Sequence, residues 1–162
     1  MRLIISDVLD LPIAEDGECR VIYNNGNIHH CIGCFGCWGK TPGRCVIKDG
    51  YENMGELMSR CSELILISRC TYGGFSPFVK NVLDRTISYA SPHFEMRKGE
   101  MHHKRRYENV IGLTAYFYGE NITENEKQTA TDIVSANSIN YDGKVNEVLF
   151  FNSADQVKEA LA

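Results

Sequence analysis

The stretch that decides the fold is ELILISRCTYGGFSPFVKNVLDR, residues 63–85. It begins with a near-continuous apolar run over residues 63–68, which is typical of a parallel strand covered on both faces. Adjacent glycines then turn the chain. Ser76 and Pro77 supply an N-cap and a first helical residue, and apolar residues follow at spacings of three and four. A strand, a turn and a helix in this order indicate an α/β domain.

The rest of the chain repeats this alternation of strand and helix. Apolar runs predict further strands at residues 2–6, 19–24, 109–118 and 146–151. Helical spacing predicts further helices at residues 51–61, 122–139 and 153–162, the second opening with a capping-box pattern from Thr123 to Glu126. The alternation predicts one domain, residues 1–162, with a doubly wound parallel sheet in the order 2-1-3-4-5. Ligands are expected beyond the carboxyl ends of its strands.

One connection is too short for this architecture. Residues 7–18 cannot hold both a ligand loop and a helix of roughly ten residues, so the first crossover helix is predicted to be missing. The sheet face carrying residues such as Leu3, Ile5, Val21 or Tyr23 would then lose its cover. We expect a second chain or the N-terminal segment to cover it, most simply in a homodimer. Residues 91–107 are expected to form a long functional or mobile loop.

Composition excludes several kinds of partner. The chain has 162 residues and a net charge of −4, which argues against nucleic acid. No apolar run approaches the roughly 20 residues of a membrane span, and early charges interrupt any signal peptide. Seven cysteines without an export signal indicate a cytoplasmic protein, in which clustered cysteines more often bind metal or do redox chemistry than form structural disulfides.

The densest motif is CIGCFGCWGKTPGRC, residues 31–45. Its spacing is C-x2-C-x2-C-x7-C, and its cysteines are Cys31, Cys34, Cys37 and Cys45. Two interpretations are open: the thiolates hold a metal cluster, or a reduced-thiol loop shapes the wall of an active site or a dimer interface.

Together, residues 31–50, residues 71–85 and the segment MHHKRRY at 101–107 resemble the flavodoxin-like NADPH-dependent FMN reductases and, within them, the iron–sulfur flavoproteins. The resemblance implies a flavodoxin-like fold, bound FMN, NAD(P)H as a substrate, and hydride or electron transfer to an unknown acceptor. It assigns the following residues to the cofactor site: Thr71, Tyr72, Gly73, Gly74, Phe75, Ser76, Tyr116 and Gly119. It also makes Cys31, Cys34, Cys37 and Cys45 the ligands of a [4Fe-4S] cluster.

The sequence departs from this family after the first strand. Relatives hold the FMN phosphate there with backbone amides and a helix N-terminus, whereas this chain has SDVLDLP at residues 6–12. Asp7 and Asp10 would repel a phosphate, and no helix is expected to follow. The alternative function is therefore a non-catalytic relative that serves as a binding or partner subunit. The basic segment at residues 102–106 fits either the phosphates of NADPH or a solvated basic loop.

Overall fold

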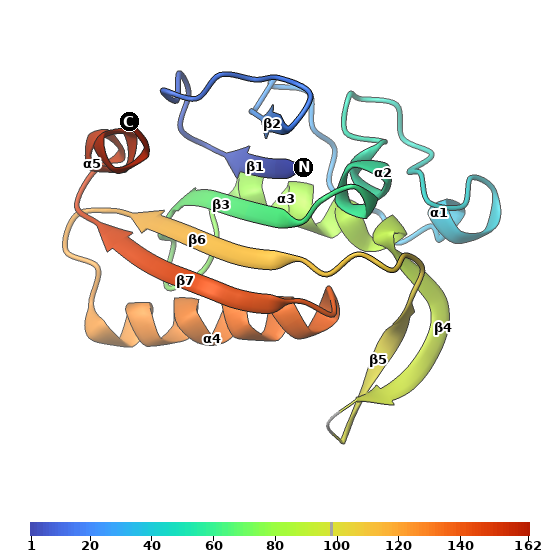
Figure 1. Ribbon diagram of the computed structural model, residues 1–162. Helices are drawn as coiled ribbons and strands as arrows, with labels where there is room; N and C mark the ends of the chain where they lie inside the picture. Colours follow the sequence, from blue (N-terminus) through green and yellow to red (C-terminus); the bar gives the residue numbers. More distant parts are fainter. Residues whose placement is uncertain (98) are drawn as a thin grey trace.

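The computed structural model describes residues 1–97 and 99–162, and its main feature is a five-stranded parallel sheet (Figure 1). The strand order is β2-β1-β3-β6-β7, which is the predicted order of the five parallel strands. Their bounds are β1 Arg2–Ser6, β2 Cys19–Ile22, β3 Glu63–Arg69, β6 Gly112–Tyr118 and β7 Lys144–Phe151. The helices are α1 Gly36–Gly39, α2 Met54–Ser59, α3 Pro77–Arg85, the 3-10 helix η1 Thr86–Tyr89, α4 Glu124–Asn140 and α5 Ala154–Leu161.

The predicted starts of α3 and α4 are confirmed, whereas the helix predicted from residue 51 begins at Met54. Ser76 caps α3 by accepting a hydrogen bond from the Val79 N–H, with Pro77 as the first helical residue. Thr123 and Glu126 form the full capping box of α4. Both caps satisfy amides that the first helical turn leaves without a partner, and this explains why the helices begin where they do.

The larger core lies between the sheet and α2, α3 and α4. Leu3, Ile5, Leu64 and Leu66 alternate along β1 and β3 and are buried there. The expectation that Leu3 and Ile5 lie on the uncovered face is therefore wrong, because both side chains pack on the side of the sheet that α2 and α3 cover.

The opposite face of the sheet is the one that lacks the first crossover helix, and other segments of the chain pack on it. Residues 7–18, all of which the structure describes, form no helix, so the first crossover helix is absent as expected. Val8 and Leu11 of this segment pack over Ile4 and Val21, and Val157 of α5 completes the cover. Of the two predicted covers, the N-terminal segment lies on this face of the sheet.

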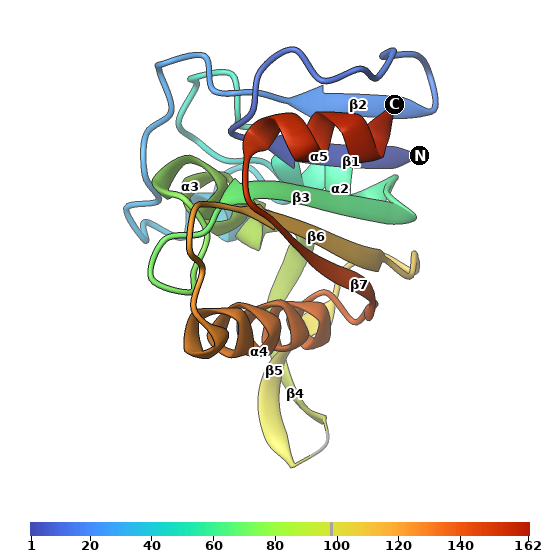
Figure 2. The same cartoon turned by 90° about the vertical axis from the view of Figure 1, so that its left-hand side faces the viewer.

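The prediction of a loop at residues 91–107 is wrong. The segment forms an antiparallel hairpin of β4, Ala90–Arg97, and β5, Glu100–Arg105. Polar and apolar residues alternate along β4, whereas Met101 is the one apolar residue of β5, and Gly99 between the strands has a φ of 85°. Figures 1 and 2 both show the hairpin extending away from the sheet. Among the described residues, no helix combines the length and apolar character needed to cross a membrane.

Candidate functional site

A tight turn follows the central strand β3 at the carboxyl edge of the sheet. The backbone groups of Thr71 and Gly74 bond to each other in both directions, at 3.0 and 2.8 Å. Between them, Tyr72 and Gly73 have φ values of 52° and 76°, both in the left-handed region. A Cβ on Gly73 would come within 2.8 Å of Thr129 Cβ on α4, so only glycine fits at this position.

The aromatic ring of Tyr72 is almost fully open to solvent, with 91% of the residue exposed. A non-glycine residue in the left-handed region costs on the order of 1 kcal/mol, and such strain clusters at binding and active sites. The turn therefore holds an exposed aromatic ring beyond the strand ends, where ligands of parallel sheets bind.

The next two predicted cofactor residues, Phe75 and Ser76, have structural contacts. Phe75 is buried and stacks on Phe117, with ring centroids 5.1 Å apart. The backbone N–H of Ser76 donates to Ser68 Oγ at 2.8 Å. Both contacts fix the junction between β3 and α3 and so fix the turn that carries Tyr72.

The two predicted cofactor loops are neighbours, because the Cys70 N–H donates to the Tyr118 carbonyl at 2.8 Å. Gly119 follows at this edge and donates its N–H to the Phe151 carbonyl at 3.0 Å. The side chain of Tyr116, however, lies on the opposite face of the sheet from Phe117 and packs edge-on against Phe151 at 5.7 Å. The structure therefore brings Gly119 to the Tyr72 turn but not the ring of Tyr116.

The segment after β1 is closed to a phosphate. The Asp7 N–H donates to the Ile67 carbonyl, and the Val8 N–H donates to Ser6 Oγ. The Asp7 carboxylate accepts from the Arg69 N–H at 2.9 Å and from the Tyr118 hydroxyl at 3.0 Å. Burial and this carboxylate both raise the pKa of Tyr118. Both oxygens of the negatively charged Asp7 carboxylate are therefore already bonded. No helix begins in residues 7–18 to offer free amides, so this segment does not fit an FMN phosphate.

A buried ion pair between Arg85 and Asp49 anchors the cysteine segment, which is the motif at residues 31–45. Both side chains are nearly inaccessible, at 0% exposure for Arg85 and 4% for Asp49. Arg85 donates to the two carboxylate oxygens of Asp49 at 2.7 and 3.0 Å and to the carbonyls of His29 and Ile47. Burial alone would raise the pKa of Asp49, but the bonds from Arg85 and from the His29 and Tyr51 N–H groups hold it at about 2. The pair ties both ends of the segment to α3.

All four motif cysteines line one cavity of about 720 Å³, which lies within the usual size range of ligand pockets. The cysteine segment, α3, η1, the base of the hairpin and α4 surround it. Cys31 and Cys34 are exposed, Cys45 is half-buried and Cys37 is buried. Burial, followed by the charges of the other three thiols, raises the pKa of Cys37. The four thiols therefore share one cavity and differ in exposure.

Four cysteine thiols are the ligand type that a metal cluster needs, but in this structure they are not grouped around one point. Over residues 1–97 and 99–162, no three His, Cys, Asp or Glu side chains are grouped closely enough to hold a metal ion. The cavity also has a mostly apolar lining that includes Phe75, Leu83 and Ile133. Its chemistry thus combines soft thiol donors with space for an apolar group.

Residues 102–105 of the basic segment belong to β5, and Arg106 follows the strand and donates from Nε to the Ala90 carbonyl at 3.4 Å. The His103 ring lies between Trp38 and Phe94, at centroid distances of 4.9 and 4.4 Å. Arg105 pairs with Asp142 at 3.0 Å, while Lys104 is exposed. The segment is therefore a strand and not a loop, its Lys104 and Arg105 are exposed, and Arg105 is already paired with a carboxylate of this chain.

No protein-family model matches the chain, and a comparison with curated proteins gives no match either. The function must therefore be inferred from the geometry of the chain itself.

Sequence reasoning missed the residues that organise the site. Arg85 carried a usable signal, since it stands three residues after Val82 on the apolar side of α3, where a charge needs a partner. Asp49 lies shortly after the cysteine motif, and nothing in the neighbouring residues marks it as the partner of a buried arginine. Asp7 was recognised as a charge, but its bond to Tyr118 joins residues 111 positions apart and leaves no local signal.

Proposed function

We propose that the chain is a flavodoxin-like, flavin-dependent oxidoreductase that takes hydride from a reduced nicotinamide and passes hydride or electrons to an acceptor. The observation that carries the proposal is Tyr72, which is exposed on a strained turn at the carboxyl edge of the central strand. The order of the parallel strands supports the same proposal. Strain of this kind is retained where a ligand uses it.

The residues around the turn fit the ring of a flavin better than its phosphate. When bound, the isoalloxazine ring supplies the redox chemistry, and the protein binds and orients it. Tyr72 would stack on the ring, while Gly73 keeps the turn against α4. The Asp7 carboxylate lies where a phosphate would need free amides. We therefore propose a site that binds the isoalloxazine ring and makes no hydrogen bonds to the phosphate.

The test is a pair of titrations with riboflavin and FMN, followed by flavin fluorescence. Charge-assisted hydrogen bonds contribute roughly 1.5–3 kcal/mol each, so losing two or three weakens FMN binding by several powers of ten. We expect similar, weak affinities for the two ligands. Tyr72→Ala should lower both affinities at least about tenfold, whereas Tyr72→Phe keeps the ring and should keep them. Nanomolar FMN binding with a large preference over riboflavin would contradict the proposal.

The four cysteines leave the same two interpretations for a second redox group. They supply the ligand type of a [4Fe-4S] cluster, and they equally fit a reduced-thiol wall of the cavity. Anaerobically purified protein should contain about four irons and four sulfides per chain if a cluster is resident. Cys34→Ser should then abolish its visible absorbance. Iron-free protein with titratable thiols selects the thiol wall.

A second candidate function is a non-catalytic partner subunit. The observation that favours it is the Asp7 carboxylate, whose bonds to Arg69 and Tyr118 occupy the edge where relatives bind the phosphate. A colourless protein that binds neither riboflavin nor FMN would select this candidate over the enzyme.

A further inference from the structure

Strained residues follow three neighbouring strands at the carboxyl edge of the sheet. Asp10 after β1, Tyr72 after β3 and Asn121 after β6 have φ values of 55°, 52° and 58°. Among the residues that the structure describes, five non-glycine residues have a positive φ, and these three follow adjacent strands. Because such strain is retained where a ligand uses it, the site at Tyr72 extends to the loops on both sides of its turn.

The Asp7 carboxylate is the charged group at this edge that lies next to the turn. Its Oδ2 accepts a hydrogen bond from the Arg69 N–H at 2.9 Å, and Arg69 stands three residues before Tyr72. Three residues of chain reach at most about 10 Å. The carboxylate and the turn are therefore close enough to contact the same flavin. Asp7 is half-buried, so it is partly open to solvent at this edge.

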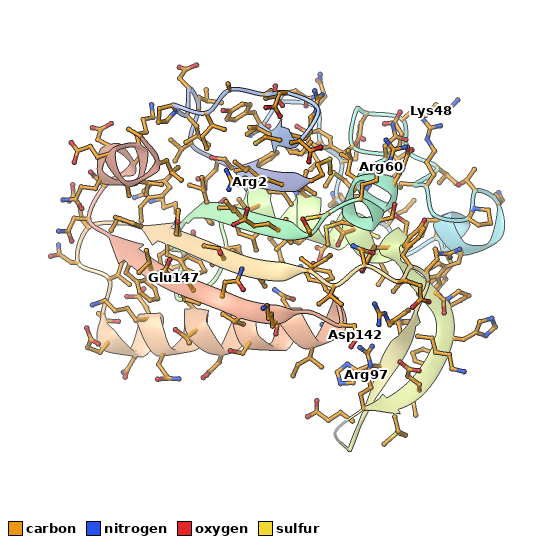
Figure 3. All side chains as sticks on the ribbon, in the orientation of Figure 1. Arg2, Lys48, Arg60, Arg97, Asp142 and Glu147 are labelled. Atoms are coloured by element: carbon orange, nitrogen blue, oxygen red, sulfur yellow. The ribbon has the colours of Figure 1, made fainter. Side chains whose placement is uncertain are left out.

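The carboxylate keeps both its charge and some of its capacity to accept hydrogen bonds. Its Oδ1 accepts from the Tyr118 hydroxyl at 3.0 Å, and each oxygen of a carboxylate can accept a second bond. Both donors are neutral, since burial and the Asp7 charge raise the pKa of Tyr118 and keep its hydroxyl protonated. The arginine of the same strand, Arg2, lies at the other end of β1 and pairs with Glu63 at 2.7 Å (Figure 3). One acceptor site on each Asp7 oxygen is left for a ligand.

A fixed negative charge with spare acceptor sites matches hydroxyl groups, which donate, and not a phosphate, which is itself negative and accepts. We infer that Asp7 binds the hydroxyl groups of the ribityl tail of a flavin whose ring stacks on Tyr72. The inference rests on the proposed flavin site and adds the group that this edge recognises, which is a chain of sugar hydroxyls in place of a phosphate. Asp7 is then a specificity-determining residue that favours a flavin with its tail over the bare ring.

A purely structural role for Asp7 makes a different prediction. Its bonds to Arg69 and Tyr118 join the ends of β1, β3 and β6, so a loss of this clamp would disturb the whole edge and weaken every flavin alike. A bond to the tail affects only those flavins that carry one. The comparison between a tailed and an untailed flavin therefore separates the two roles.

The test is a pair of fluorescence titrations with riboflavin and lumiflavin, which has a methyl group in place of the ribityl tail. A charge-assisted hydrogen bond should make wild-type chain bind riboflavin at least about tenfold more tightly than lumiflavin. Asp7→Ala should abolish this preference. Asp7→Asn keeps the size of the side chain but loses the charge, so it should fold and should lower the preference at least about threefold. Lumiflavin affinity should stay the same in both variants.

Two control variants test whether the effect belongs to the Asp7 carboxylate. Asp10→Asn removes an exposed negative charge from the same loop at a left-handed φ that asparagine adopts readily, and it should leave both affinities unchanged. Tyr118→Phe removes one donor to Asp7 and keeps the carboxylate, so the preference for riboflavin should remain.

The riboses of a nicotinamide dinucleotide also carry hydroxyls, so NADH is titrated in parallel. An Asp7→Asn variant that binds NADH more weakly and riboflavin as before would overturn the inference in favour of the nicotinamide. Equal losses for riboflavin and lumiflavin would overturn it in favour of the structural clamp. Equal wild-type affinities for the two flavins would overturn it and leave the proposed flavin site standing, whereas binding of neither flavin would overturn both.

Discussion

The buried pair of Asp49 and Arg85 gives the sharpest prediction about stability. Asp49→Asn removes the charge that compensates a fully buried guanidinium but keeps the size of the side chain. Breaking a buried pair in this way costs about 3–5 kcal/mol, because the remaining charge stays in a poorly solvating site. We expect the free energy of unfolding to fall by about 3 kcal/mol, measured by urea denaturation followed by circular dichroism.

The pH dependence supplies a second magnitude for the same pair. The pKa of Asp49 falls from its ordinary value of 3.8 to about 2 in the folded chain. Nearly two pKa units, each worth about 1.4 kcal/mol, correspond to about 2 kcal/mol of stability. Because the folded-state pKa is the lower one, this contribution is present above about pH 4 and is lost as the pH falls toward 2. Asp49→Asn should remove that part of the pH dependence.

Two variants serve as controls. Asp49→Asn/Arg85→Met leaves no buried charge and should lose less free energy than the sum of the single changes. Asp84→Asn breaks the exposed pair with Lys80 on the same helix and should cost below about 1 kcal/mol. Equal losses for Asp49→Asn and Asp84→Asn, or strict additivity in the double variant, would refute the reasoning.

Three further predictions concern the turn, the edge of the sheet and a helix cap. Gly73→Ala should lower the free energy of unfolding by about 1–3 kcal/mol in urea denaturation, since φ is 76° and the new Cβ would crowd Thr129; a neutral result would show that the turn can shift. Tyr72→Gly should raise stability by about 0.5–1 kcal/mol while weakening riboflavin binding, because it removes left-handed strain together with the ring; a loss of stability would count against strain at this residue. Thr123→Ala should lower the thermal midpoint through a loss of about 1 kcal/mol, since it deletes the cap of α4; an unchanged midpoint would mean that the start of α4 adds nothing to global stability.

Much of the site was visible in the sequence as residue types but not as contacts. The glycine turn after β3 and the four cysteines were found because each is a local motif. What the thiols face was not predictable, because the cavity walls come from α3, η1, the hairpin and α4. The hairpin was not predicted, because only β4 shows the alternation of a strand, while β5 is a polar run with one apolar residue, Met101, and such a run is equally typical of a loop.

The sequence by itself determined the parallel strands, their order, the helix starts at Ser76 and Thr123, and the absence of the first crossover helix. The strands and helix starts depend on periodicity and on neighbours within one turn of the chain, which a single sequence displays directly. The strand order follows from the rules for crossovers between parallel strands, and the missing helix follows from the length of residues 7–18. Tertiary structure decided which face of the sheet Leu3 and Ile5 occupy, how the N-terminal segment closes the opposite face, and where the charges of Asp7 and Asp49 find their partners. Those outcomes depend on groups that meet only when distant segments pack, because a buried charge or apolar face is stabilised by any segment that can reach it, at whatever distance along the chain.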